Sequence, residues 1–177
     1  RHRCVAVDIA EPMLEQCRKL NPEVQAVAGD MRDVALDQDF DAVLVHDAID
    51  YLVRPDDVLA TLRNAHRHLK PGGILLAAPT YVTETFEPGE DADDGSEEGG
   101  WAFACSLSDV DPVTQTFELC ITMMPPGSDE PIEDVHTCGL FDALQWEDWL
   151  NEAGFDVLPI ELGDDDPPWC LFVGKKA

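Results

Sequence analysis

Five side chains that can bind a ligand or transfer a proton lie directly after short apolar stretches of this sequence. They are Asp8, Asp30, His46, Asp47 and Tyr51. A carboxylate accepts hydrogen bonds from two neighbouring hydroxyl groups at once, and it can also accept from an amine. A histidine or a carboxylate within reach of a substrate can take a proton from it. These residue types at the ends of strands indicate a site that binds a ligand and supports acid–base chemistry.

The apolar stretches alternate with helical patterns, which places the five side chains along one edge of a sheet. Short strands are expected at 4–9, 24–28, 41–45 and 74–78. Helices are expected from Glu11 and from Pro55, and the second should end at segment 69–73, because proline cannot continue a helix and glycine accepts left-handed angles. Strand–helix–strand units build parallel sheets whose carboxyl edge gathers ligands. The expected fold is α/β, an open, doubly wound, mostly parallel sheet, with Pro79 and Thr80 at the same edge.

The charge of the chain excludes two classes of partner. The 177 residues fit a single domain, and 37 acidic against 11 basic residues give a net charge of −26. So negative a field repels nucleic-acid phosphates and anionic membranes, and no apolar run is long enough to span a membrane. We expect neither partner. The Asp-rich, Lys-poor composition resembles that of proteins from salt-loving organisms, so halophily is a hypothesis.

The cysteines indicate a reducing compartment. The chain has 6 cysteines, none of them in a CxxC pair, and no secretory signal opens it. Metal sites and disulfide frameworks show tighter spacing. We expect reduced thiols, a cytoplasmic location and no metal site.

Four segments in a fixed order carry a resemblance to a known family. They are Val5-Ala6-Val7-Asp8, Ala28-Gly29-Asp30-Met31, Asp41-Ala42-Val43-Leu44 and Leu69-Lys70-Pro71-Gly72-Gly73-Ile74. Together they resemble the class I, Rossmann-like methyltransferases that depend on S-adenosylmethionine. The resemblance implies an enzyme that uses S-adenosylmethionine as cofactor and transfers its methyl group to the nitrogen or oxygen of a small molecule. Each segment alone is a weak signal, and their order and separations make the signal specific.

The resemblance assigns cofactor contacts to two of the aspartates. In this family the acidic residue that ends the second strand holds both ribose hydroxyls, which places that role on Asp8, with Ile9 beside it. The acidic residue after the third strand binds the adenine amino group, which corresponds to Asp30, with Met31 beside the ring.

Proton transfer and substrate contact fall to residues farther along the chain. His46 is expected either to take a proton or to pack against the cofactor, and Asp47 to contact the cofactor from a turn. Tyr51 is the candidate for substrate contact, and the alternative is that it packs at the start of its helix. His136 is the second catalytic candidate, and the alternative is a strand residue with one wet face.

The glycine-rich first strand of the family is not found in this sequence. Gly72-Gly73 belongs to the helix stop and Gly99-Gly100 to an acidic stretch. We therefore expect a sheet that lacks its first strand, and a chain that corresponds to the C-terminal portion of such an enzyme. Two alternatives remain open. One is a non-catalytic methyltransferase-like interaction or regulatory subunit, and the other is an NAD-dependent Rossmann enzyme in which Asp8 still holds a ribose.

Residues 81–141 are expected to form an insertion within the domain. The acidic stretch 87–100 has little to bury and is expected to be a mobile, solvated loop. Apolar residues that alternate along 101–107 and 117–123 predict an antiparallel β-hairpin with one buried face. A third strand is expected at 135–141.

The end of the chain narrows the resemblance. His136, the pair Leu140-Phe141 and the segment Leu171-Phe172-Val173-Gly174 are similar to N-methyltransferases that act on nucleotide-linked amino sugars. A helix that includes residues 146–150 is expected to end with Gly154 as its C-cap. Residues 156–162 and 169–174 are expected to close the sheet as an antiparallel pair joined by an acidic turn. A small molecule is the expected partner, and a homodimer is a further hypothesis.

Overall fold

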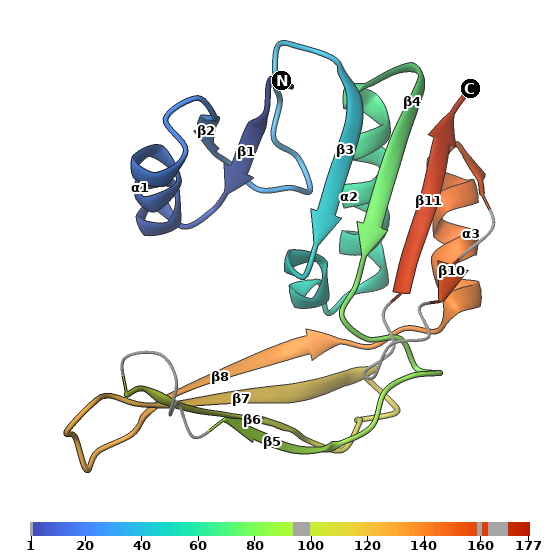
Figure 1. Cartoon of the computed structure of the whole chain (residues 1–177). Helices are drawn as coiled ribbons and strands as arrows, with labels where there is room; N and C mark the ends of the chain where they lie inside the picture. Colours follow the sequence, from blue (N-terminus) through green and yellow to red (C-terminus); the bar gives the residue numbers. More distant parts are fainter. Residues whose placement is uncertain (1, 94–99, 159–160, 163–169) are drawn as a thin grey trace.

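The computed structural model describes residues 2–93, 100–158, 161–162 and 170–177 of the chain. Figure 1 shows three groups of elements: a small strand–helix–strand unit at the N-terminus, a larger sheet with two helices behind it, and a separate antiparallel sheet. The α/β organisation predicted from the sequence is therefore present. The acidic turn expected between the last two strands lies outside the described residues.

The N-terminal unit, residues 5–28, consists of one helix and two parallel strands. β1 (Val5–Asp8) pairs with β2 (Gln25–Ala28), and α1 (Glu11–Leu20) connects them. Proline in the first turn of α1 and an acidic residue beside it suit the positive end of the helix dipole. Leu14 is the one side chain of this unit that is buried among the described residues. The unit therefore has little core of its own.

A second group, called the body here, holds most of the core. Its elements are β3 (Phe40–His46), the short 3-10 helix η1 (Ala48–Tyr51), α2 (Pro55–His68), β4 (Leu69–Ala78), α3 (Ala143–Ala153), β9 (Phe155–Val157), β10 (Glu161–Leu162) and β11 (Cys170–Lys176). The sheet order is β10-β11-β4-β3, and β9 also pairs with β11. β3 and β4 are parallel, whereas β11 runs antiparallel to its neighbours. The predicted closing antiparallel strands are therefore confirmed.

Both helices of the body end as the sequence predicts. α2 begins at Pro55 and ends at His68, after which the chain passes directly into β4, so segment 69–73 is part of that strand as well as a helix stop. α3 begins with a capping box, in which the Asp142 side chain accepts from the Gln145 backbone, and it ends at Gly154, whose φ of 97° requires glycine.

The core of the body lies between the sheet and its two helices. α2 and α3 lie on the same face of the sheet (Figure 1), where Leu75 of β4 and Phe172 of β11 are fully buried against Leu62 of α2 and Leu150 of α3. On the opposite face Leu44 of β3 is 65% exposed.

No backbone ladder joins β1 to β3 in the described part of the chain. β1 pairs with β2, and β3 pairs with β4. The structure thus has two separate parallel pairs. The expectation that the sheet lacks the family's first strand stays a prediction.

The antiparallel sheet is larger than the sequence predicts. Its strands are β5 (Gly89–Asp93), β6 (Ala102–Leu107), β7 (Thr116–Met124) and β8 (Ile132–Gly139), in that order. The prediction that residues 87–100 form a mobile loop is wrong for 89–93, because the edge of β6 pairs with this acidic segment through the backbone. The expected burial of the β6 apolar face is also wrong at its outer end, where Trp101 and Phe103 are exposed.

Candidate functional site

A cavity of about 220 Å³ lies between the body and the antiparallel sheet. Its lining residues are Asp47, Asp50, Tyr51, Thr80, Tyr81, Cys105, Phe117, Leu119 and Cys138. The first five follow the carboxyl ends of β3 and β4, where parallel sheets bind ligands, and the other four come from β6, β7 and β8. The antiparallel sheet, which lies in the predicted insertion 81–141, therefore forms one wall of the cavity.

A strained turn connects β3 to the cavity. Asp47 has φ 51° and ψ −51°, a conformation that residues other than glycine rarely adopt. Its amide donates to the Ala78 carbonyl at 3.2 Å, and its carbonyl accepts from the Asp50 amide at 2.9 Å. Its carboxylate accepts from the Thr80 hydroxyl at 3.3 Å and lies 3.2 Å from His46 Nε2. The turn thereby directs residues 47–51 into the cavity wall.

Asp50 is the most deeply buried acid of the cavity. It is 9% exposed, and both of its carboxylate oxygens accept from the single amide of Thr80, at 3.0 and 3.2 Å. Burial raises the pKa of this carboxyl from 3.8 to about 6. Burial and the nearby Asp50 carboxyl likewise raise the pKa of the Cys138 thiol to about 11. The sequence interpretation did not select Asp50, although a carboxylate within the apolar run 48–52 is a signal that could have found it.

Tyr51 and His136 come together beside the cavity. Their rings meet edge to face with centroids 5.3 Å apart, and His136 Nε2 lies 3.3 Å from the Asp134 carboxylate. In the register of the antiparallel sheet, His136 is opposite Leu119, a lining residue. Gly139 permits this approach of β8 to the body, because a Cβ there would lie 2.5 Å from the Leu52 carbonyl oxygen. The side chain of His46, in contrast, is 62% exposed, and neither histidine lines the cavity.

The two aspartates assigned to the cofactor lie on adjacent strands. Asp8 ends β1 and is opposite Ala28 of β2, and Asp30 follows two residues later. One oxygen of Asp8 accepts from the Ala10 amide at 2.8 Å. Ile9, next to it, is 79% exposed. The predicted pair thus lies along one sheet edge.

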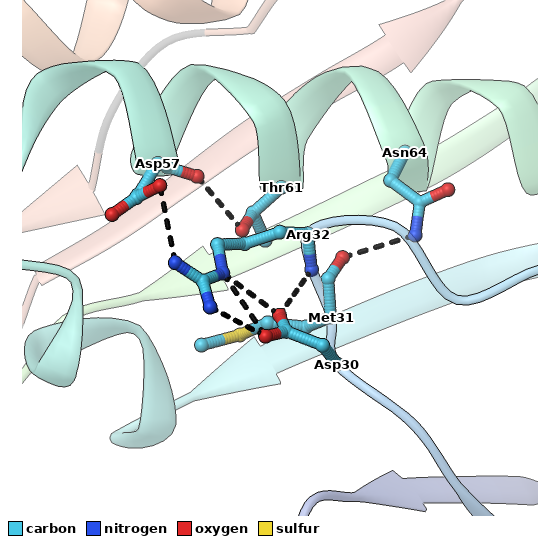
Figure 2. A network of polar contacts seen from close by, with 6 residues as sticks. All are labelled: Asp30, Met31, Arg32, Asp57, Thr61 and Asn64. Atoms are coloured by element: carbon cyan, nitrogen blue, oxygen red, sulfur yellow. Dashed lines mark hydrogen bonds and ion pairs between the residues drawn. The ribbon is translucent and has the colours of Figure 1, made fainter.

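Arg32 binds the Asp30 carboxylate and connects it to α2 of the body (Figure 2). The Arg32 side chain donates to both Asp30 oxygens at 2.6–3.1 Å, its backbone amide donates to Oδ1 at 2.9 Å, and its other guanidinium nitrogen lies 3.2 Å from Asp57 of α2. These donors lower the pKa of the Asp30 carboxyl below its ordinary value. This bridge could not be predicted from the sequence, because it depends on the position of α2.

Further polar contacts fix the segment 30–36 on α2. The buried amide of Asn64 donates to the carbonyls of Met31 and Val34 at 3.0 and 3.1 Å, and His68 Nε2 accepts from the Leu36 amide at 2.9 Å. Met31 itself packs against the core of the body. We call this set of contacts, together with the Arg32 bridge between Asp30 and Asp57, the α2 clamp. It determines where the edge that carries Asp30 lies relative to the body.

Among the described residues, no group of three or more His, Cys, Asp or Glu side chains is arranged to hold a metal ion. The described helices include none that is both long and apolar enough to cross a membrane.

Comparisons with known proteins agree with this geometry. The family described as "Methyltransferase domain" matches residues 1–77. The dTDP-3-amino-3,4,6-trideoxy-alpha-D-glucopyranose N,N-dimethyltransferase of Streptomyces venezuelae is 30% identical over 174 residues, which cover 97% of this chain and 73% of the relative. The dTDP-3-amino-3,6-dideoxy-alpha-D-glucopyranose N,N-dimethyltransferase of Streptomyces fradiae is 28% identical over 155 residues, or 85% of this chain and 60% of the relative.

Solved structures extend the likeness to the whole fold. Streptomyces venezuelae DesVI has a TM-score of 0.83 and 29% identity, over 98% of this chain and 74% of that one. CalS10, an amino pentose methyltransferase from Micromonospora echinaspora solved with S-adenosylmethionine bound, has a TM-score of 0.80 over 99% of this chain and 74% of that one. At 24% identity the second match speaks for the fold alone.

Proposed function

Because this chain belongs to the class I S-adenosylmethionine-dependent methyltransferases, we propose that it methylates the amino nitrogen of a small molecule of the amino-sugar type. The family membership confirms the Rossmann-like class and the cofactor predicted from the sequence, and it removes the NAD-dependent alternative. The observation that carries the proposal is the buried carboxylate of Asp50 in a cavity at the carboxyl edge of β3 and β4. The amino-sugar relatives support the nitrogen acceptor.

Residues along the sheet edge fit the cofactor. The second carboxylate oxygen of Asp8 has no hydrogen-bond partner among the described residues, which leaves it an acceptor for ribose hydroxyls, with Ile9 beside it. Asp30, whose side chain is 32% exposed, would share its oxygens between Arg32 and the adenine amine. Met31 would lie beside the ring. When bound, S-adenosylmethionine supplies a methyl group on a positively charged sulfur, which needs no further activation.

The chain therefore has to position the acceptor and receive a proton. The amine nitrogen must present its lone pair to the methyl carbon, and the proton that it loses must reach a base or solvent. We propose that Tyr51 contacts the acceptor and that His136, in contact with Tyr51, receives this proton. His46 and Asp47 follow β3, where Asp47 holds the turn and is also the proposed cofactor contact, and His46 is a second candidate base.

Location and assembly complete the proposal. We propose that the protein acts in the cytoplasm and, as an acidic protein with few lysines, in a high-salt environment. We also propose a homodimer, because Phe103 and Ile132 at the outer end of the antiparallel sheet are 43% and 49% exposed. Light scattering after size-exclusion chromatography measures this assembly directly.

A binding experiment tests the cofactor assignment. We expect Asp8→Ala to abolish the binding of S-adenosylhomocysteine in calorimetry of the intact protein, with an unchanged melting temperature, because the ribose loses its acceptor. Asp37→Ala, which removes an exposed carboxylate from a loop, is the matched control. Retained affinity in Asp8→Ala would refute the assignment. The activity itself is tested by mass spectrometry of an amine acceptor, which should gain one methyl group in the presence of S-adenosylmethionine.

A further inference from the structure

We propose that the acceptor binds in this cavity as a positively charged amine that carries no phosphate group, and that this ammonium gives one proton to His136 before its nitrogen attacks the methyl carbon. The inference rests on the proposed methyltransferase function and specifies its substrate class. It separates this chain from its two named relatives, whose names give dTDP-linked sugars as substrates.

The buried carboxylate of Asp50 accepts fewer hydrogen bonds than its two oxygens allow. An ionised carboxylate offers about four acceptor positions, and here one backbone amide is shared between its two oxygens. Within the described residues, no Lys or Arg side chain lies within ion-pair distance of it, although it is 9% exposed. A charge buried without a partner is costly, and an ammonium group in the cavity would supply both hydrogen bonds and the opposite charge.

The remaining walls of the cavity suit a cation. Asp47 adds a second carboxylate at the mouth, and Tyr51, Tyr81 and Phe117 present aromatic rings. Aromatic faces attract ammonium groups through their quadrupole. Leu119 and the two lining cysteines, of which Cys138 has a raised thiol pKa, add no positive charge.

The acceptor side of the protein also lacks the groups that bind phosphate. From Pro71 to Gly174 the sequence contains no Lys and no Arg, so the entire antiparallel sheet and all of α3 are without them. Phosphates are bound by such side chains or by free amides at helix N-termini. Two of the first three amides of α3 are already taken, since Ala143 donates to Glu84 and Gln145 donates to Asp142.

Long-range charge acts in the same direction. A chain with a net charge of −26 repels a diphosphate as it approaches and attracts an ammonium ion. The local and global fields thus favour the same acceptor class, namely a free amino sugar or a comparable small amine.

A matched pair of acceptors tests the inference without any mutation. The probes are 3-amino-3,6-dideoxy-D-glucose and its dTDP-linked form, which present the same amine with and without the diphosphate. We expect kcat/KM for the free sugar to exceed that for the dTDP-linked form by about tenfold or more. Equal or faster methylation of the dTDP-linked form would overturn the inference and leave the proposed function intact. Methylation of neither amine would count against the proposed function, and the inference would fall with it.

A variant tests the role of Asp50. Asparagine keeps an oxygen for the Thr80 amide and removes the charge, so we expect Asp50→Asn to raise KM for the free amino sugar about tenfold, with unchanged affinity for S-adenosylhomocysteine. Asp109→Asn, an exposed carboxylate between β6 and β7, controls for the loss of one net charge and should leave KM unchanged. An unchanged KM in Asp50→Asn, or an equal rise in both variants, would refute the role of Asp50.

Discussion

The N-terminal unit and the body are held in place by different forces. The body encloses a continuous apolar core between one face of its sheet and two helices, with Leu62, Leu75, Leu150 and Phe172 fully buried. In the part of the chain that the structure describes, the N-terminal unit buries only Leu14, and no strand pairing joins it to the body. The polar α2 clamp therefore has to carry much of the positioning that a shared core provides elsewhere.

The two kinds of interaction have different roles. Apolar burial stabilises the body, whereas directional hydrogen bonds align segment 30–36 with it. Burial of apolar surface scales with area and is not directional, whereas hydrogen bonds such as those of Asn64 define where one segment lies on another. The cavity proposed for the acceptor is built on the body, whereas Asp8 lies on the N-terminal unit and Asp30 follows it at the start of segment 30–36. The relative placement of the two proposed binding regions thus depends on segment 30–36.

Matched truncations of two leucines should produce the largest contrast. Leu62 of α2 is 0% exposed and Leu14 of α1 is 1% exposed. We expect Leu62→Ala to lower the free energy of unfolding of the body by about 2–5 kcal/mol, because it opens a cavity in a packed core. We expect Leu14→Ala to speed amide exchange within residues 5–28 and to leave the exchange of α3 unchanged. Denaturant titration and hydrogen exchange measure the two effects, and a loss of global stability in Leu14→Ala that equals that of Leu62→Ala would contradict the division.

Two aspartates show the same contrast in their titration. Arg32 lowers the pKa of Asp30, so the contribution of this ion pair is present at neutral pH and is lost as pH falls through the lowered pKa. Burial raises the pKa of Asp50 from 3.8 to about 6, so between these values the folded chain binds more protons than the unfolded chain. Stability of the body should therefore fall as pH rises through this window.

The variant Asp50→Asn tests that sign. It removes the buried charge, so we expect the variant to be more stable than the parent at neutral pH, by on the order of 2 kcal/mol. We expect the advantage to vanish below about pH 4, where the parent carboxyl is protonated in both states. Melting temperatures of both proteins across this range, at constant salt, measure the difference. A parent that is more stable than the variant at neutral pH would show that the Asp50 charge is compensated within the protein.

The sequence predicts most of the elements whose signals are local. The proline and acidic residues at the start of α2, the segment 69–73 at its end and Gly154 after α3 all act within a few residues, and these boundaries were predicted correctly. β5 was missed because its side chains show no apolar alternation, and its pairing depends on the free edge of β6.

The site was less predictable than the fold. Asp8 and Asp30 could be placed on one edge because parallel strands end together. The burial of Asp50 could not be predicted, because it results from β8 crossing over residues 48–52, a contact between segments far apart in the sequence. The bridge from Arg32 to Asp57 depends on tertiary structure in the same way.

Removal of the Asn64 amide should loosen the clamp with a smaller effect on the body. Asn64 is 7% exposed and donates to two carbonyls of segment 30–36. We therefore expect Asn64→Ala to lower the free energy of unfolding by about 1–2 kcal/mol. We also expect faster amide exchange at 30–36 and weaker binding of S-adenosylhomocysteine. Arg63→Ala, on the solvent-exposed side of the same helix, is the control. If both variants bind the probe equally, the clamp does not align the cofactor edge.

The smallest effect is expected for Arg32, which lies at the exposed end of the clamp. Exposed ion pairs contribute little to stability because water screens them, so we expect Arg32→Ala to leave the melting temperature of the body unchanged. The guanidinium nonetheless fixes the direction of the Asp30 carboxylate through two parallel hydrogen bonds, a geometry that lysine cannot reproduce. Arg32→Lys keeps the charge but loses this pair of hydrogen bonds. We therefore expect it to show the same faster amide exchange at residues 30–36 as Arg32→Ala. If the lysine variant instead retains the slow exchange of the parent, charge alone holds this segment on α2, and the N-terminal unit is anchored less specifically than the α2 clamp implies.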